Sequence, residues 1–212
     1  SAEEAYKNVL SDVGSNQPVF DDHDIRIVDE TLQGTYKYKG SKSGLPGMLD
    51  THEDVGGLET YPELRREASW DTDRDGLPDW WEKLNSLNPN SKSEDFSDAN
   101  ADPDKDGFTN LDLYLDWLAN PHYFLTTGKV LDIDLRQLFR GFTESPSYRV
   151  LNVENGKAEL KDGGAAAQFS SDNTGLATIN FSVSDKDGSS MNRKVGVYIT
   201  GDATGQNQPA ID

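Results

Sequence analysis

The chain has 212 residues, enough for one large domain or several small ones, and 34% of them are hydrophobic. Its formal net charge of −18 excludes a typical nucleic-acid-binding surface, which needs Lys and Arg to contact phosphates, and it disfavours an anionic membrane surface. The absence of cysteine excludes disulfides, cysteine-based zinc sites and thiol catalysis, and no apolar run is long enough for membrane insertion.

Residues 1–70 are expected to form an irregular tail with two short helices. The segment 5–10 has an amphipathic helical pattern, and a second pattern at 24–30 ends at Gly34. Residues 35–70 contain Gly-rich and Pro-containing loops with little periodicity. A loop region of that length needs another surface for its order, so we expect this stretch to rest on one.

The first of two acidic loops, residues 71–82, has the ligand spacing of an EF-hand calcium loop. Oxygen-bearing side chains occupy positions 1, 3, 5, 9 and 12, and Gly76 at position 6 allows the sharp turn. Position 7 of such a loop binds through its backbone carbonyl. Crowded carboxylates repel one another unless a hard cation, which takes about six to eight oxygens, binds between them. The predicted Ca²⁺ ligands are Asp71, Asp73, Asp75, Leu77, Asp79 and Glu82.

The second acidic loop begins at Asp102 and repeats this spacing, with Gly107 at the same offset. Its position 12 is Leu113, whose side chain offers no oxygen. Either Asp112 closes the site by a shifted geometry, or water and another residue such as Asp98 complete it. The predicted Ca²⁺ ligands are Asp102, Asp104, Asp106, Phe108, Asn110 and Asp112.

An Asp-rich run is often only a solvated surface, but three observations favour metal binding here. The spacing repeats, the Gly repeats, and each loop leads into an apolar helical pattern, at 78–87 and at 109–118. The stretch 71–112 contains ten Asp and two Glu against four Lys or Arg, a net charge of −8 that a cation would reduce. We therefore predict a calcium-binding loop–helix module at 71–124 whose aromatic residues form its core.

From residue 129 the hydrophobic pattern changes to a period of two, which is typical of strands. The predicted strands are 129–135, 147–153, 157–161, 165–169, 176–184 and 191–199. Turn signals separate them, so an antiparallel β-sandwich is expected at 125–200, followed by a polar tail at 201–212. Asp185 and Asp187 are expected to shape a turn, with calcium binding as the alternative. The predicted fold class is α+β in several parts.

Residues 3–62 resemble the final segment of bacterial pectate lyases that have a parallel β-helix fold. The resemblance lies in Ala-Tyr-Lys-Asn-Val-Leu at 5–10, Asp-Val-Gly at 12–14, Asp-Ile-Arg-Ile-Val-Asp-Glu at 24–30 and Asp-Val-Gly-Gly at 54–57. In that family the segment follows the catalytic β-helix and packs along it. The resemblance therefore implies that a catalytic β-helix domain of the same enzyme is a partner of these residues.

The acidic stretch resembles the calcium segment often appended to those enzymes, and it is also similar to thrombospondin type 3 repeats and dockerins. The matching runs are 75–82, 87–90, 98–100 and 106–111. More loosely, residues 129–200 resemble cadherin-like or immunoglobulin-like repeats of bacterial extracellular proteins, through the runs 134–139, 148–150, 181–185 and 195–197. These resemblances imply a Ca²⁺ cofactor and a secreted protein, whose signal peptide would lie upstream.

The family's chemistry implies a β-helix with calcium-binding carboxylates and an arginine that removes the proton α to a uronate carboxylate. Stacked β-helix coils and the Arg-x-Pro-x-x-Arg pattern are both missing from this sequence. We therefore expect a non-catalytic accessory region of a polysaccharide lyase, which stabilises the enzyme, with binding of pectin or polygalacturonate as a further role.

Three alternatives remain open at this point. The first is a carbohydrate-binding module for acidic glycan, in which Trp70, Trp117 or Tyr198 would stack on a sugar ring. The second is one part of a split lyase, active only with its β-helix. The third is a calcium-dependent protein docking module similar to dockerin.

Overall fold

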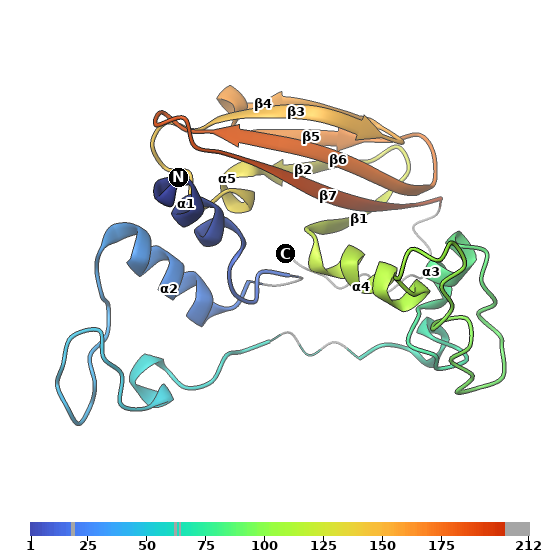
Figure 1. The fold of residues 1–212 in the computed structure, drawn as a ribbon, viewed down its shortest axis with the longest axis horizontal. Helices are drawn as coiled ribbons and strands as arrows, with labels where there is room; N and C mark the ends of the chain where they lie inside the picture. Colours follow the sequence, from blue (N-terminus) through green and yellow to red (C-terminus); the bar gives the residue numbers. More distant parts are fainter. Residues whose placement is uncertain (18–19, 62, 64, 202–212) are drawn as a thin grey trace.

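The computed structural model describes residues 1–17, 20–61, 63 and 65–201 (Figure 1). Helix α1 spans Ala2–Asp12, and the Ser1 hydroxyl accepts a hydrogen bond from the Glu4 backbone N–H at 3.0 Å as part of a capping box. Helix α2 spans Asp22–Gln33 and ends at Gly34, whose φ of 60° forms a left-handed C-cap. Both predicted helices are confirmed, and each begins before the first residue of its predicted pattern.

Residues 35–70 contain little regular structure in their described part, as predicted. Two short 3₁₀-helices occur there, η1 at His52–Val55 and η2 at Ala68–Trp70. The Asp54 carboxylate accepts hydrogen bonds from the backbone N–H groups of Asp50 and Thr51 at 2.8 and 3.2 Å. Local side-chain bonds to the backbone therefore replace a regular ladder in these loops.

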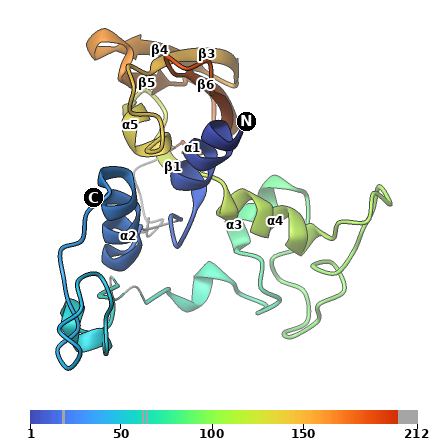
Figure 2. The ribbon, with the colours of Figure 1, turned by 60° about the vertical axis from the view of Figure 1, so that its left-hand side comes forward.

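Helices α3, Asp79–Leu84, and α4, Asn110–Ala119, each follow an acidic loop. Thr109 caps α4, whereas α3 begins after Pro78, a residue suited to the start of a helix. The two helices lie side by side (Figure 2) and share one core of buried aromatic and aliphatic side chains. The members of this core, here called the aromatic cluster, are Leu77, Trp80, Trp81, Ala99, Tyr114 and Trp117.

In the described part of the chain, seven strands form two sheets, which together are called the two-sheet region (residues 122–200). A four-stranded sheet has the order β1-β7-β6-β3, and a three-stranded sheet has the order β2-β5-β4. The strands are β1 His122–Thr126, β2 Val130–Asp134, β3 Ser147–Glu154, β4 Lys157–Lys161, β5 Ala166–Ser170, β6 Gly175–Ser184 and β7 Ser190–Thr200. The chain is thus a mixed α+β protein, and all six predicted strands are present.

The sheets differ from the prediction at one edge. Strand β1 was not predicted, and it pairs with β7 in parallel, with His122 opposite Gly196, whereas every other strand pair is antiparallel. The predicted boundary at residue 124 therefore divides a strand. The segment that begins at Pro121 follows α4 directly and contains a short apolar run. The local pattern alone therefore predicts that it ends the helical module.

Buried side chains from both sheets belong to one hydrophobic core. Ile133 of β2 and Phe169 of β5 join Phe181 of β6 and Val195 of β7, each at most 1% exposed. Alternate residues along β6 are buried, which is the period-two pattern that predicted this strand. The short helix α5, Leu135–Leu138, adds apolar side chains at the edge of the same core.

Helix α1 packs on the two-sheet region through buried ion pairs. Lys7 Nζ lies 3.0 Å from Asp185 Oδ2 and 2.9 Å from Asp187 Oδ2. Arg193 on β7 donates a hydrogen bond to the Ser11 carbonyl at 2.7 Å and pairs with Asp12. Asp185 and Asp187 thus bind a lysine, and helix α1 packs on the two-sheet region, whereas the described part of residues 35–70 runs away from the sheets (Figure 1).

Among the described residues, no helix combines the length and the hydrophobicity needed to cross a membrane. The predicted polar tail, apart from Gly201, lies outside the described residues.

Candidate metal centre in the first acidic loop

The backbone of the first loop is folded by its own aspartates. Asp71 accepts hydrogen bonds from the backbone N–H groups of Arg74 at 2.8 Å and Gly76 at 3.2 Å. Asp75 accepts one from the Leu77 N–H at 2.8 Å. Arg74 and Gly76 have φ values of 62° and 98°, so the chain turns through left-handed conformations at both positions. The turn directs successive carboxylates to the inside of the loop.

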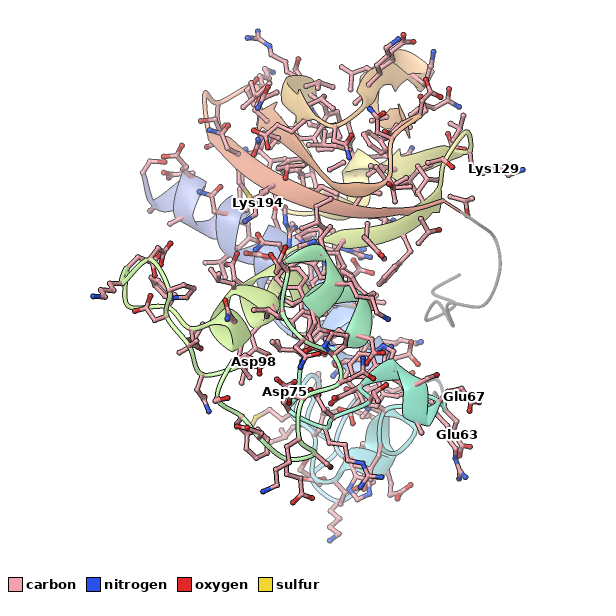
Figure 3. All side chains as sticks on the ribbon, turned by 90° about the vertical axis from the view of Figure 1, so that its right-hand side faces the viewer. Glu63, Glu67, Asp75, Asp98, Lys129 and Lys194 are labelled. Carbon is pink, nitrogen blue, oxygen red and sulfur yellow. The ribbon has the colours of Figure 1, made fainter. Side chains whose placement is uncertain are left out.

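Five carboxylates gather at this loop in two overlapping groups. In one group Asp71, Asp73 and Asp75 each place an oxygen within 4.8 Å of the others, and in the second Asp75, Glu82 and Asp98 do so. Because Ca²⁺ binds oxygens at roughly 2.3–2.6 Å, ligands on opposite sides of one ion lie about 5 Å apart. The spacing of these oxygens therefore fits a Ca²⁺ coordination sphere. Figure 3 labels Asp75 and Asp98, which lie near each other in the loop region.

Burial distinguishes these carboxylates from an ordinary acidic surface. Asp73 and Asp75 are each 2% exposed, and Glu82 is fully buried. Asp73 Oδ1, Asp75 Oδ2 and both carboxylate oxygens of Glu82 have no hydrogen-bond partner. Buried carboxylate oxygens without partners are costly, and a cation removes that cost by supplying the missing charge. The unpaired oxygens therefore fit a metal ligand set.

The electrostatics of the centre lead to the same conclusion. Burial, reinforced by the negative charges of Asp73, Asp75 and Asp98, raises the pKa of Glu82 to about 8. Burial also raises the pKa of Asp75 to about 6, although its hydrogen bond from the Leu77 N–H opposes the shift. Metal ligands must be deprotonated, so a cation that binds here displaces protons from these groups.

Two predicted ligands of the first loop, Asp79 and Leu77, do not belong to the two carboxylate groups. Asp79 accepts hydrogen bonds from the Thr72 backbone N–H at 2.9 Å and from the Thr72 hydroxyl at 3.1 Å, and its carboxylate lies 3.4 Å from Lys83 Nζ. The Leu77 side chain is fully buried in the aromatic cluster, and its backbone carbonyl stays a predicted ligand. Asp79 therefore helps to close the loop, while Asp71, Asp73, Asp75 and Glu82 lie where the sequence predicts ligands.

Asp98 belongs to the first loop rather than the second. Sequence reasoning considered it as a residue that completes the second site, because it precedes that loop by a few positions. The fold instead brings its carboxylate to Asp75 and Glu82. The Ala99 side chain, 1% exposed, anchors this segment in the aromatic cluster. No spacing rule connects residues this far apart in sequence, so only the packed structure identifies this candidate ligand.

The second loop repeats the backbone of the first but not its burial. Asp102 accepts hydrogen bonds from the N–H groups of Asp106 at 3.2 Å and Gly107 at 3.0 Å. Its three aspartates, Asp102, Asp104 and Asp106, place oxygens within 4.8 Å of one another, but Asp104 and Asp106 are exposed. Solvated carboxylates at a surface are common without a metal, so this group is the weaker of the two.

The remaining predicted ligands of the second loop, Phe108, Asn110 and Asp112, lie outside its carboxylate group. Asp112 accepts hydrogen bonds from the Thr109 N–H at 2.8 Å and hydroxyl at 2.7 Å, which lower its pKa and complete the capping box of α4. Asn110 is buried, and its amide donates to the Asp98 carbonyl at 2.7 Å. Phe108 has an exposed side chain, 59% accessible. The Asp112 carboxylate therefore caps α4, and its role in closing the second site stays a prediction.

Two of the three predicted sugar-stacking residues pack in or against the aromatic cluster. Trp117 is 8% exposed, and Trp80, Trp81, His122 and Phe124 surround its ring. Tyr198 stacks on Trp80, with ring centroids 4.3 Å apart.

The stacking prediction for Trp117 is corrected, because its ring is buried in the aromatic cluster, whereas Tyr198 is partly buried and its role stays a prediction. The third, Trp70, is partly buried, and the Arg66 guanidinium lies 4.2 Å from its ring centroid, in a cation–π contact.

Comparisons with known proteins give no family assignment. No protein-family model and no curated protein match the chain. A PKD domain from the KIAA 1837 protein is 11% identical over 42% of this chain and 89% of its own, with a TM-score of 0.30. InlP from Listeria monocytogenes is 13% identical over 38% of this chain and 26% of its own, with a TM-score of 0.25.

A 2,6-sialyltransferase from Photobacterium sp. JT-ISH-224 is 11% identical, matches 39% of this chain and 17% of its own, and has a TM-score of 0.28. Likenesses of this size carry no conclusion about function.

Proposed function

We propose that the chain is a calcium-binding, non-catalytic accessory region of a secreted polysaccharide lyase of the pectate-lyase type. The observation that carries the calcium proposal is the group of buried, unpaired carboxylate oxygens on Asp73, Asp75 and Glu82. An all-oxygen donor set with several carboxylates suits Ca²⁺ or Mg²⁺, and the crowded, irregular arrangement favours the larger Ca²⁺, which accepts more ligands and flexible geometry.

The task proposed for the cation is structural. Its ligands come from the first loop, from α3 and from the segment at Asp98, so one ion would hold three stretches of chain together. We further propose that the two sheets pack face to face as a β-sandwich, supported by the single core to which both contribute. The accessory region would then be a metal-stabilised unit beside the catalytic β-helix domain.

Titration calorimetry on the full chain tests the calcium proposal directly. Chelator-treated protein should bind at least one Ca²⁺ per chain and bind Mg²⁺ more weakly, because Mg²⁺ demands near-ideal octahedral geometry and gives up its waters reluctantly. A flat Ca²⁺ titration would refute the proposal.

A lyase activity assay tests the non-catalytic role. When the chain is incubated with polygalacturonate, we expect no unsaturated product. Any turnover by the chain alone would contradict this role.

Binding of pectic polysaccharide is the further role proposed for this region, and affinity electrophoresis tests it. The chain would be run in gels that contain polygalacturonate, with Ca²⁺ or with EDTA. Retardation that needs Ca²⁺ is expected if the ion bridges acidic protein and acidic glycan. Since Trp117 is buried and Trp80 covers one face of the Tyr198 ring, Trp70→Ala is the informative variant. Unchanged mobility of the unmutated protein would remove this role.

A calcium-dependent docking module is the second candidate function, and one observation favours it. Phe108, Leu113 and Leu115 are 59%, 47% and 50% exposed on the second loop and α4, so apolar side chains face solvent beside an acidic loop. Replacing Leu113 and Leu115 with Ser should leave calcium binding unchanged but abolish binding to the separate catalytic domain in a pull-down. If the catalytic domain captured the variant and the unmutated chain equally well, this candidate would be excluded.

A further inference from the structure

Helix α3 is less than two turns long, and it presents a candidate metal ligand and two buried tryptophans on different sides. Glu82 points to the carboxylate group, while Trp80 and Trp81 pack in the aromatic cluster, 6% and 5% exposed. An isolated helix of six residues is unstable in water, because the cost of its first turn is not recovered in so short a segment. The position of Glu82 therefore depends on what holds the two tryptophans.

The four-stranded sheet supplies a large part of that anchor. Trp80 stacks on Tyr198 of β7 with an interplanar angle of 24°, and it meets Phe124 of β1 edge to face at 5.9 Å. Trp117 of α4 packs so closely on β7 that a Cβ atom at Gly196 would lie 2.6 Å from its Nε1. The aromatic cluster thus joins both loop–helix units to one face of strands β1 and β7.

We infer that this face of the sheet positions Glu82 for the cation, so that Phe124 and Tyr198 set the affinity of a metal site they do not touch. This inference rests on the proposed cation binding in the first loop. If the metal holds one side of α3 and the sheet holds the other, both contacts require the same position of the helix. Each contact therefore stabilises the position that the other requires. Thermodynamic linkage then makes the effect reciprocal: calcium strengthens the packing of α3 on the sheet, and the packing strengthens calcium binding.

Adjacent residues on β1 offer a matched test of this coupling. Phe124 contacts the aromatic cluster, whereas Tyr123 packs against the core shared by the two sheets. Calcium affinity would be measured by calorimetry on the full chain for the unmutated protein, Phe124→Ala and Tyr123→Ala. Phe124→Ala should weaken Ca²⁺ binding about tenfold, a typical size for coupling between sites. Tyr123→Ala should change the affinity by less than about twofold, although it also removes a large core side chain.

A conservative variant separates ring packing from loss of the fold. Tyr198→Phe keeps the ring that stacks on Trp80 and should bind Ca²⁺ as the unmutated protein does, while Tyr198→Ala should lose affinity by about the same factor as Phe124→Ala. Aromatic NMR signals of Phe124 should also move when Ca²⁺ is added to the unmutated chain.

The outcomes distinguish this inference from the proposed function. Normal calcium affinity in both Phe124→Ala and Tyr198→Ala would overturn the coupling and leave calcium binding standing. Equal losses in Tyr123→Ala and Phe124→Ala would overturn it too, because general destabilisation would then explain both. An unmutated chain that binds no Ca²⁺ would remove the proposed function and this inference with it.

Discussion

The two acidic loops have the same backbone conformation but different surroundings. Arg74 and Lys105 at the fourth position have φ values of 62° and 60°, and Gly76 and Gly107 at the sixth both have 98°. In each loop the first aspartate accepts a hydrogen bond from the N–H of that glycine. Short-range spacing is therefore sufficient to specify the turn.

What differs is the chain that packs over each turn. The first loop is closed by the fully buried Glu82 and approached by Asp98, whereas the second has Leu113 at its twelfth position and an Asp112 that caps α4. A turn with the right spacing thus becomes a strong candidate centre only where the rest of the fold buries its carboxylates and adds more of them. Four predictions test how far the two loops differ, from the largest expected effect to the smallest.

Replacing Glu82 by Gln should produce the largest effect. Loss of partners that only orient a ligand costs about 10–100-fold in metal affinity, so loss of a direct carboxylate ligand should cost about 100-fold or more. Asp104→Asn in the second loop should leave the tightest binding step unchanged, because Asp104 is exposed and belongs to the other group. Calcium titrations of the two variants make the comparison, and equal losses would mean that the loops are equivalent.

Removing calcium should lower the thermal midpoint of the chain. A ligand at 100 times its Kd that binds only the folded state stabilises that state by about 2.7 kcal/mol. For a chain of this size that corresponds to a shift of roughly 5–10 °C. Melting curves in Ca²⁺ and in EDTA measure the shift. Asp104→Asn should show nearly the full shift and Glu82→Gln little of it, and the reverse order would assign the main site to the second loop.

The metal-free protein should become less stable as the pH rises through the range set by Glu82. Its pKa is about 4.5 in the unfolded chain and about 8 in the folded one, so the folded state binds the extra proton. This contribution to the free energy of unfolding is fully present below about pH 4.5 and is lost as the pH rises to about 8.

Urea unfolding of calcium-free protein at several pH values would show this decline. Glu82→Gln should have a shallower pH dependence, because Gln does not titrate. Saturating Ca²⁺ should remove the contribution of Glu82, since the ion keeps the carboxylate deprotonated. Identical slopes for the unmutated protein and Glu82→Gln would contradict the prediction.

The smallest effect should come from the fourth loop position and should be equal in the two loops. Left-handed backbone costs a non-glycine residue about 1–2 kcal/mol, and glycine avoids that cost but loses more entropy on folding. Arg74→Gly and Lys105→Gly should therefore each raise the free energy of unfolding by roughly 0.5 kcal/mol. Lys92, which is not among the residues with positive φ, should lose stability when replaced by Gly. A clear difference between the two loop variants would show that their backbones differ.

Much of the local structure follows from the sequence because it depends on neighbours. The repeated Asp and Gly spacing specifies both turns, the periodicity specifies the helices at α1, α2, α3 and α4, and alternation specifies six strands. Asp71, Asp73, Asp75 and Glu82 are predicted ligands that the fold brings into the two overlapping carboxylate groups of one centre. Each of these features depends on residues that lie within about twelve positions of one another in the sequence.

The remaining features depend on contacts between distant segments, which only the tertiary structure decides. Asp98 lies beside Asp75 and Glu82, β1 pairs with a strand far along the chain, and Trp117 packs on Gly196. The same packing stacks Tyr198 on Trp80 and leaves the second loop exposed. Sequence therefore determines where this protein turns and which groups line each turn, while long-range burial determines which of its two acidic loops holds buried carboxylate oxygens without hydrogen-bond partners.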